Sequence, residues 1–231
     1  MKRFWREARV EEAPGGYAVR LDARPLSTPA RAPLVVPTRS LAEAVAAEWD
    51  RQEGEVRPAE LPLTRSANSA IDRVLPQRPE VAEAIAAYGE TDLLCYRAPH
   101  PEGLARRQAE LWDPLLDWAA AALGARLRTG AGVMHVMQPA HATEALARAV
   151  TAHDAWALTA LNELVTLSGS LVLGLAVSHR RLEGREAWRL SRLDEDWQSA
   201  EWGEDAEAAA AAARREAEFC AAERLLHLLR D

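Results

Sequence analysis

The stretch Glu53-Gly-Glu-Val-Arg-Pro-Ala-Glu-Leu-Pro62 separates two parts of the chain that differ in pattern. Its glycine and prolines interrupt both helical and strand periodicity, as is typical of an extended connector. Before it a strand-like alternation of apolar residues occurs, and after it apolar residues recur at the spacing of helices. We therefore expect a two-domain α+β fold. Residues 1–60 would form a small β-rich domain, a meander or barrel-like sheet with one helix, and residues 61–231 a larger all-helical domain.

The strands of the first domain are predicted by alternation and by turn residues. Tyr17, Val19 and Leu21 alternate with small or polar residues, which is the period of a half-buried strand. Pro14-Gly15-Gly16 is a turn signal before this strand, and Leu34–Val36 between two prolines predicts another short one. Such short strands are marginally stable alone, so we expect the sheet to lean on a helix.

That helix is predicted to follow directly. Ser40 and Glu43 have the spacing of a capping box, in which each side chain bonds the other residue's backbone N–H. Three apolar residues four apart then define one helical face. They are Leu41, Val45 and Trp49.

The second domain reads as a succession of helices. Asp113-Pro114 predicts either a kink or a break with Asp113 as the cap of the second piece. Asp154 is expected to cap one long apolar helix that reaches about His179, and residues 184–201 to form another helix. Polar and small residues interrupt the apolar run 161–177, which therefore predicts a buried helix rather than a membrane span.

Composition and motifs exclude several classes of function. The chain of 231 residues carries 28 basic and 35 acidic residues, and this acidic balance argues against nucleic-acid binding. Lys2 is the only lysine and no phosphate-binding loop sequence occurs, so nucleotide-driven work is not expected. Cys95 and Cys220 form no C-x-x-C, and no apolar export signal follows Met1, which indicates a reducing compartment.

The thiols and histidines give no sign of catalysis or metal binding. Cys95 stands among leucines and a tyrosine and is predicted to be a buried, inert thiol, and Cys220 is predicted to lie in the core as well. The six histidines make no H-E-x-x-H and no pair four apart on one helix. We expect neither a metal nor another cofactor.

The most distinctive segment is acidic and aromatic. Residues 194–207 hold seven acidic residues and no Lys or Arg, which equals the net charge of −7 of the whole chain. Trp197 and Trp202 lie within it, and aromatic groups among charges are common where a partner docks. We expect Trp197 to face the core and Trp202, beside Gly203 at the helix end, to lie on the surface. Paired carboxylates or a cation site are an alternative reading, although consecutive helical residues point in different directions.

Several short strings recur in a characteristic order along nearly the whole chain. They are Lys2–Arg6, Leu21–Pro25, Thr28–Pro29, Leu34–Pro37, Leu41–Ala44, Ala47–Asp50, Leu61–Arg65, Ala70–Arg73, Asp92–Tyr96, Trp112–Leu116, Leu158–Leu161 and Leu193–Gly203. Each string is weak alone, but their order and spacing together make a strong signal. Through them the chain resembles the assembly chaperones of F1-type ATP synthase that handle its alpha subunit.

The resemblance implies a chaperone that binds the free alpha subunit without ATP, prevents its aggregation and yields it as the α/β ring forms. It implies a site in the acidic segment, in a protein that is a monomer when free and lies in the bacterial cytoplasm. The expected partner-binding residues are Asp194, Glu195, Asp196, Gln198, Glu201, Trp202 and Gly203. Two alternatives stay open: an enzyme with an acidic metal or acid–base site near residues 194–207, and a permanent structural subunit.

Overall fold

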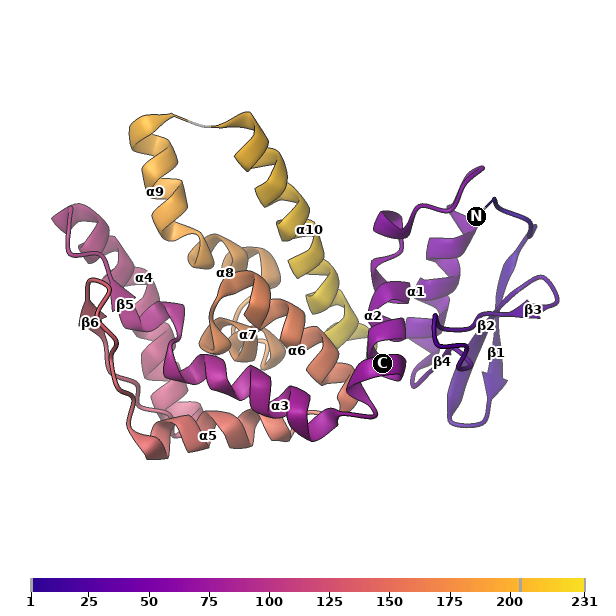
Figure 1. Cartoon of the computed structure of the whole chain (residues 1–231), viewed down its shortest axis with the longest axis horizontal. Helices are drawn as coiled ribbons and strands as arrows, with labels where there is room; N and C mark the ends of the chain where they lie inside the picture. The colour runs from indigo at the N-terminus through magenta and orange to yellow at the C-terminus, as the bar shows by residue number, and fades with distance from the viewer. Residues whose placement is uncertain (1, 204, 231) are drawn as a thin grey trace. The chain divides into compact units, whose positions relative to one another are not determined.

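The computed structural model describes residues 2–203 and 205–230 (Figure 1). The chain forms two compact units. The first comprises Met1–Arg78, Asp154–Ala160 and Arg224–Asp231, and the second comprises Pro79–His153 and Leu161–Glu223. A small sheet near the amino terminus and helices over most of the remaining chain confirm the predicted α+β class. The domain boundary at residues 60/61 stays a prediction.

The sheet of the first unit is an open meander. Strand β1 (Ala8–Ala13) pairs antiparallel with β2 (Gly16–Leu21), and β3 (Arg24–Pro25) and β4 (Val35–Val36) also pair with β2. The predicted strand is confirmed, since Val19 and Leu21 of β2 are buried. The first hairpin turns through Gly15, whose φ of 88° favours glycine.

Helix α1 (Arg39–Asp50) packs on β1 and β2. Its predicted apolar face is confirmed because Leu41, Val45 and Trp49 are all buried. The predicted capping box is wrong, since Ser40 lies inside the helix. Thr38 is the cap instead, and its Oγ1 accepts a 3.3 Å hydrogen bond from the backbone N–H of Leu41.

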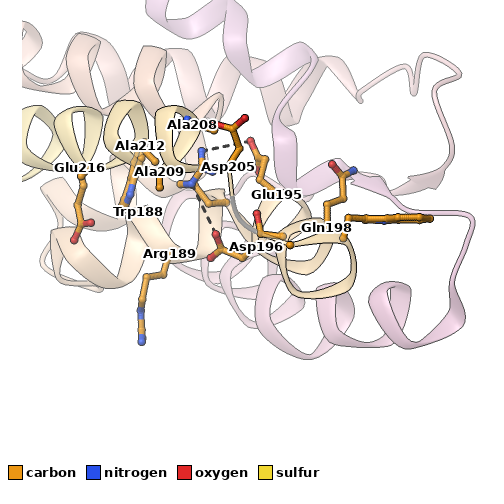
Figure 2. A pocket seen from close by; sticks show the side chains of 15 residues that line it. Trp188, Arg189, Glu195, Asp196, Gln198, Asp205, Ala208, Ala209, Ala212 and Glu216 are labelled. Atoms are coloured by element: carbon orange, nitrogen blue, oxygen red, sulfur yellow. Dashed lines mark hydrogen bonds and ion pairs between the residues drawn. The ribbon is translucent and has the colours of Figure 1, made fainter.

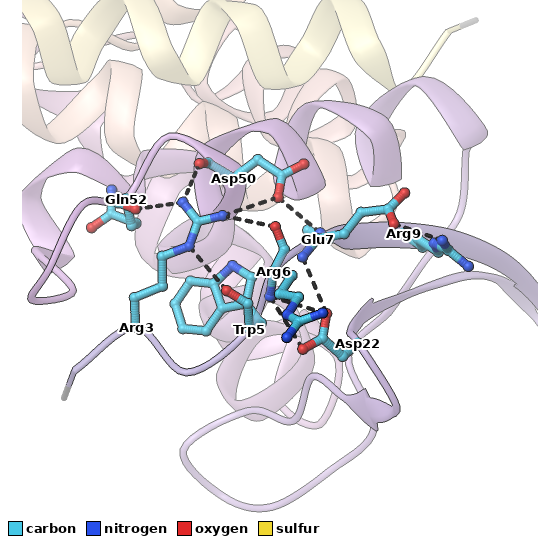
Figure 3. A network of polar contacts seen from close by, with 9 residues as sticks. Arg3, Trp5, Arg6, Glu7, Arg9, Asp22, Asp50 and Gln52 are labelled. Atoms are coloured by element: carbon cyan, nitrogen blue, oxygen red, sulfur yellow. Dashed lines mark hydrogen bonds and ion pairs between the residues drawn. The ribbon is translucent and has the colours of Figure 1, made fainter.

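Polar contacts fix the amino-terminal segment to α1 and β2 (Figure 3). The guanidinium of Arg3 donates to the backbone oxygens of Asp50 and Gln52, at 2.6 and 2.7 Å. The Asp22 carboxylate accepts from the backbone N–H groups of Arg6 and Glu7, each at 3.1 Å. The string that begins at Lys2 therefore has a structural role in this unit.

A buried carboxylate caps helix α2 (Pro62–Ser69), whose own preceding residue supplies no side-chain cap. Glu48, from α1, accepts hydrogen bonds from the backbone N–H groups of Leu63 at 2.7 Å and Thr64 at 2.9 Å, and from Thr64 Oγ1 at 2.7 Å. Backbone N–H groups in a first helical turn lack intrahelical partners, so this carboxylate stabilises the start of α2.

The remaining elements follow in chain order. They are η1 (Pro58–Glu60), η2 (Ala70–Val74), α3 (Arg78–Ala86), η3 (Ala87–Glu90), η4 (Leu93–Cys95), β5 (Tyr96–Arg97), α4 (Glu102–Trp118), η5 (Ala119–Leu123), β6 (Gly130–Ala131), α5 (Ala140–Thr151), α6 (Ala155–Ser168), α7 (Leu171–Ser178), α8 (Gly184–Ser191), α9 (Leu193–Trp202) and α10 (Ala206–Leu228).

The predicted long apolar helix is in fact two helices. Asp154 caps α6 as expected, with Oδ1 accepting from Ala157 N at 2.8 Å. The helix ends before Gly169, whose φ of 70° is left-handed, and Ser170 then caps α7. Helix α7 is buried on all sides. In the part of the chain that the structure describes, no helix is long and apolar enough to cross a membrane.

The buried carboxylate of Asp92 fixes the start of α7 within the second unit. It accepts from Ser170 Oγ and from the backbone N–H of Val172, both at 2.8 Å. Burial raises the pKa of Asp92, against hydrogen bonds that lower it.

Asp113-Pro114 neither breaks α4 nor starts a second helix, because α4 continues through Pro114 to Trp118.

Candidate protein-docking site

Helix α9 carries most of the acidic segment and begins at a break. The predicted single helix over residues 184–201 is wrong, since α8 ends at Ser191 and α9 starts at Leu193. Leu193 is buried and anchors the first turn of α9. The next three residues, Asp194 to Asp196, place carboxylates at the helix N-terminus, where the helix dipole favours negative charge.

Asp194 is engaged within the fold. Its Oδ1 accepts a 2.6 Å hydrogen bond from Nε2 of Gln108, which lies in α4 and is completely buried. The Oε1 of the same amide accepts from Ala98 N at 2.7 Å. Asp194 therefore ties α9 to α4, which makes it the least available of the predicted docking carboxylates.

Glu195 and Asp196 are exposed and lie beside one cation. The Arg192 guanidinium is 3.7 Å from Glu195 and 3.9 Å from Asp196, and it also lies over the ring of Trp188 at 5.7 Å (Figure 2). At these distances in water the ion pairs are weak, so both carboxylates can reorganise toward a partner.

The two tryptophans of the segment differ in exposure. Trp202 is 88% exposed, which confirms the prediction of a surface residue. Trp197 is half-buried, so the expectation that it belongs to the core is wrong. Its ring rests on Gly103 of α4, where an added Cβ would lie 3.1 Å from Trp197 Cη2. Trp197 thus acts as a packing contact at the edge of the core.

An open hollow of about 840 Å³ lies among α8, α9 and α10 (Figure 2). Five of the predicted docking residues line it together. They are Glu195, Asp196, Gln198, Trp202 and Gly203. The opposite wall is the alanine face of α10, with Ala208, Ala209 and Ala212, which lies across from α9 in Figure 2.

Two predicted docking residues lie elsewhere. Asp194 is directed to α4 as described above. Glu201 lines a second hollow of about 460 Å³ among α4, α8 and α9, together with Leu111 and Trp197, and Asp196 lines this hollow as well as the first. The structure therefore divides the predicted site between two sides of α9.

Sequence reasoning missed the residues that complete the first hollow. Arg189 and Arg192 supply cations, and Asp205 caps α10 through Oδ1, which accepts from the backbone N–H groups of Glu207 and Ala208 at 2.8 and 2.9 Å. The alanine wall could have been found, because Ala208, Ala209 and Ala212 share one face of a helix by their spacing. Glu204 lies outside the described residues.

The groups with potential chemistry lie apart from these hollows. Cys95 is buried, as predicted, and this burial raises the pKa of its thiol to about 12. Cys220 is only half-buried, so its expected place in the core is wrong, although burial still raises its pKa. Among residues 2–203 and 205–230, no three His, Cys, Asp or Glu side chains gather as ligands of a metal ion would.

Comparison with known protein families identifies this chain as a chaperone. Residues 2–120 match the family described as "ATP12 chaperone protein". This match covers more than half of the chain, and the chain belongs to the ATP12 chaperone family. The resemblance to ATP synthase assembly chaperones expected from the sequence is thereby confirmed.

Solved structures and one curated relative agree with this family. The crystal structure of Atp12 from Paracoccus denitrificans is 50% identical and has a TM-score of 0.95, with 99% of this chain and 98% of that chain covered. The Atu1473 protein of Agrobacterium tumefaciens is 43% identical, with a TM-score of 0.95 over 99% of this chain and 86% of that chain. The mitochondrial protein atp12 of Schizosaccharomyces pombe is 27% identical over 214 residues, which cover 87% of this chain and 74% of that protein.

Proposed function

We propose that this chain binds the unassembled alpha subunit of F1 ATP synthase and prevents its aggregation until the α/β ring assembles. It does so without ATP and without catalysing a reaction, as a monomer in the bacterial cytoplasm. The observation that carries this proposal is the placement of an 88% exposed Trp202 beside the exposed Glu195 and Asp196, on one hollow of an ATP12-family protein.

The physical reason for such a chaperone lies in its client. A ring subunit without its neighbours exposes a large apolar interface, which leads to aggregation. A protein that covers this interface competes with the next subunit and is displaced by mass action when that subunit arrives. The hollow suits this task because it combines charge, which steers encounter, with an aromatic contact, which supplies affinity.

Dilution of denatured alpha subunit into buffer tests the proposal. With a molar equivalent of the chaperone and no nucleotide, light scattering should fall, and gel filtration should show a complex of the two proteins. Addition of the cognate beta subunit should then release the chaperone. Unchanged aggregation together with no complex would contradict the proposal.

The two alternatives predict different outcomes. Retention of the chain in the finished ring would favour a permanent structural subunit. Stoichiometric, tight binding of Mg²⁺ or Zn²⁺ that requires Glu195 and Asp196 would favour an enzymatic site instead.

A further inference from the structure

Three large apolar side chains are exposed together in a loop of the second unit. Val133 is 96% exposed, Met134 79% and Met137 74%, within five consecutive residues that precede α5. Burial of such side chains stabilises a folded protein, and this loop leaves three of them in solvent. A single exposed apolar residue is ordinary, but a group of them marks an interaction site.

Specific hydrogen bonds close this loop, which we define as residues 128–138. The backbone N–H of Arg128 donates to Oε1 of Gln138 at 2.8 Å, and Nε2 of Gln138 donates back to the Arg128 carbonyl at 2.9 Å. Strand β6 inside the loop pairs parallel with β5, and Gly132 N donates to the Arg97 carbonyl at 2.9 Å. The loop is therefore anchored at its base and at its first turn.

The apolar residues of the loop lie on two sides, one packed against the loop itself and one facing solvent. Val136 is half-buried and packs on Gly130, where an added Cβ would lie 2.6 Å from Val136 Cγ2. Its backbone N–H points to the Tyr96 hydroxyl at 3.5 Å. With Val136 turned inward, Met134 and Met137 face solvent, so their exposure is part of an ordered arrangement.

The formal charge of residues 125–139 is opposite in sign to that of the whole chain. Residues 125–139 contain Arg126 and Arg128 and no Asp or Glu, whereas the whole chain carries a net charge of −7. Both arginines are exposed. The complement of this loop is an apolar surface bordered by acidic groups, and the flexible thioether side chains of methionine adapt well to such a surface.

We propose that the 128–138 loop is a second docking element, which covers an apolar, acid-bordered surface of the unassembled alpha subunit. This inference rests on the function proposed above and assigns part of the binding to a loop far in sequence from α9. A symmetric contact with the same loop of a second copy is a poorer occupant, because it would bring the arginines of the two loops together.

Methionine oxidation tests this proposal, since the sequence of 231 residues contains three methionines, Met1, Met134 and Met137. Dilute peroxide should oxidise Met134 and Met137 readily in the free chaperone, as measured by mass spectrometry of the peptide that contains both. In a complex with alpha subunit at saturation, we expect their oxidation to slow by about tenfold or more.

Paired variants test the energetic contribution of the same side chains. Met134→Ser with Met137→Ser should weaken binding of alpha subunit by roughly tenfold to a hundredfold, while Met134→Leu with Met137→Leu should retain the affinity. Leu75→Ser is the matched control, because Leu75 is also an exposed apolar residue, at 51%, in another segment. The Leu75→Ser variant should bind the alpha subunit with the affinity of the unmodified protein.

The outcomes distinguish this inference from the proposed function. A complex that forms normally while both methionines oxidise as fast as in the free chain overturns the docking loop alone. Protection that grows with chaperone concentration in the absence of alpha subunit also overturns it, in favour of self-association. If the unmodified chaperone does not bind alpha subunit at all, the proposed function and this inference both fail.

Discussion

The side-chain amide of Gln108 in α4 donates a 2.6 Å hydrogen bond to the carboxylate of Asp194 in α9. These residues are 86 positions apart in sequence, and the amide is fully buried. The contact separates Asp194 from the carboxylates that follow it, because its role is to hold a helix rather than to meet a partner.

Replacement of Asp194 by alanine should lower the free energy of unfolding by about 1–3 kcal/mol, since the buried Gln108 amide would lose its acceptor. The control is Glu195→Ala, which removes an exposed carboxylate from the same helical turn and should change stability by less than about 0.5 kcal/mol. Urea denaturation checks both. Equal effects of the two substitutions would show that Asp194 has no special structural role.

Replacement of Trp202 by alanine should leave the unfolding free energy within about 0.5 kcal/mol, because an 88% exposed ring contributes little to the fold. If Trp202 is a hot spot for the alpha subunit, binding should weaken by about 2–4 kcal/mol, or roughly 30-fold to 1,000-fold. Titration calorimetry measures the change. Full affinity in this variant would remove Trp202 from the docking site.

Charge reversal by Glu195→Arg should slow association with the alpha subunit and make the rate less sensitive to salt, because the acidic surface steers encounter. Glu83→Arg is the matched control, as Glu83 is an exposed residue of α3 outside both hollows. Stopped-flow association at two salt concentrations provides the measurement. Similar rates for the two variants would argue for net charge alone rather than a local site.

Removal of the Glu48 carboxylate should destabilise the first unit strongly. Glu48→Ala leaves the first turn of α2 without its acceptor, and we expect a loss of about 2–4 kcal/mol. Glu43→Ala, from an exposed position of the same helix α1, should cost less than about 0.5 kcal/mol. Hydrogen exchange of Leu63 and Thr64 would localise the effect, and unchanged protection there would contradict the capping role.

The two thiols should differ in the rate at which they are alkylated. Cys220 should react with iodoacetamide well before Cys95, whose pKa of about 12 keeps it protonated and whose side chain is buried.

The pKa of Cys95 is raised above its ordinary value of 9.0, so the folded protein retains the thiol proton more strongly than the unfolded chain. Its contribution to stability is therefore present below pH 9 and is lost progressively as the pH rises toward 12.

Urea denaturation of the unmodified protein and of Cys95→Ala at pH 8 and pH 10, about one unit below and above the ordinary thiol pKa of 9.0, isolates this contribution. The difference in unfolding free energy between the two proteins should shrink at the higher pH. A constant difference would show that Cys95 does not titrate with unfolding.

Local sequence patterns were sufficient for much of the secondary structure. Alternation at Val19 and Leu21 predicted the strand that the structure contains, and the four-residue spacing from Leu41 to Trp49 predicted the buried face of α1. The position of Trp202 beside Gly203 predicted its exposure. These features depend on residues within one or two turns of each other, which is the range over which periodicity carries information.

The errors had different origins. The capping box was a local misassignment, since Thr38 caps α1 from only three residues before Leu41. The apolar run through Gly169, by contrast, gave no sign that Asp92, which is 80 positions from Val172, would bond the start of α7. Apolar periodicity likewise continued across the break at Arg192. At α7 the hydrogen-bond demand of the backbone is met by a side chain whose position follows from packing, whereas no side chain caps the start of α9.

The sequence by itself determined the α+β class, the family, and an acidic helix that ends in an exposed tryptophan. Only the tertiary structure decided which of those acidic residues share a surface. It directs Asp194 to Gln108, places Glu201 on the α4 side, and leaves Glu195 and Trp202 around the hollow that faces α10. The physical reason is that composition and spacing fix which groups a helix carries, whereas the neighbours packed against it fix which of those groups stay free to meet a partner.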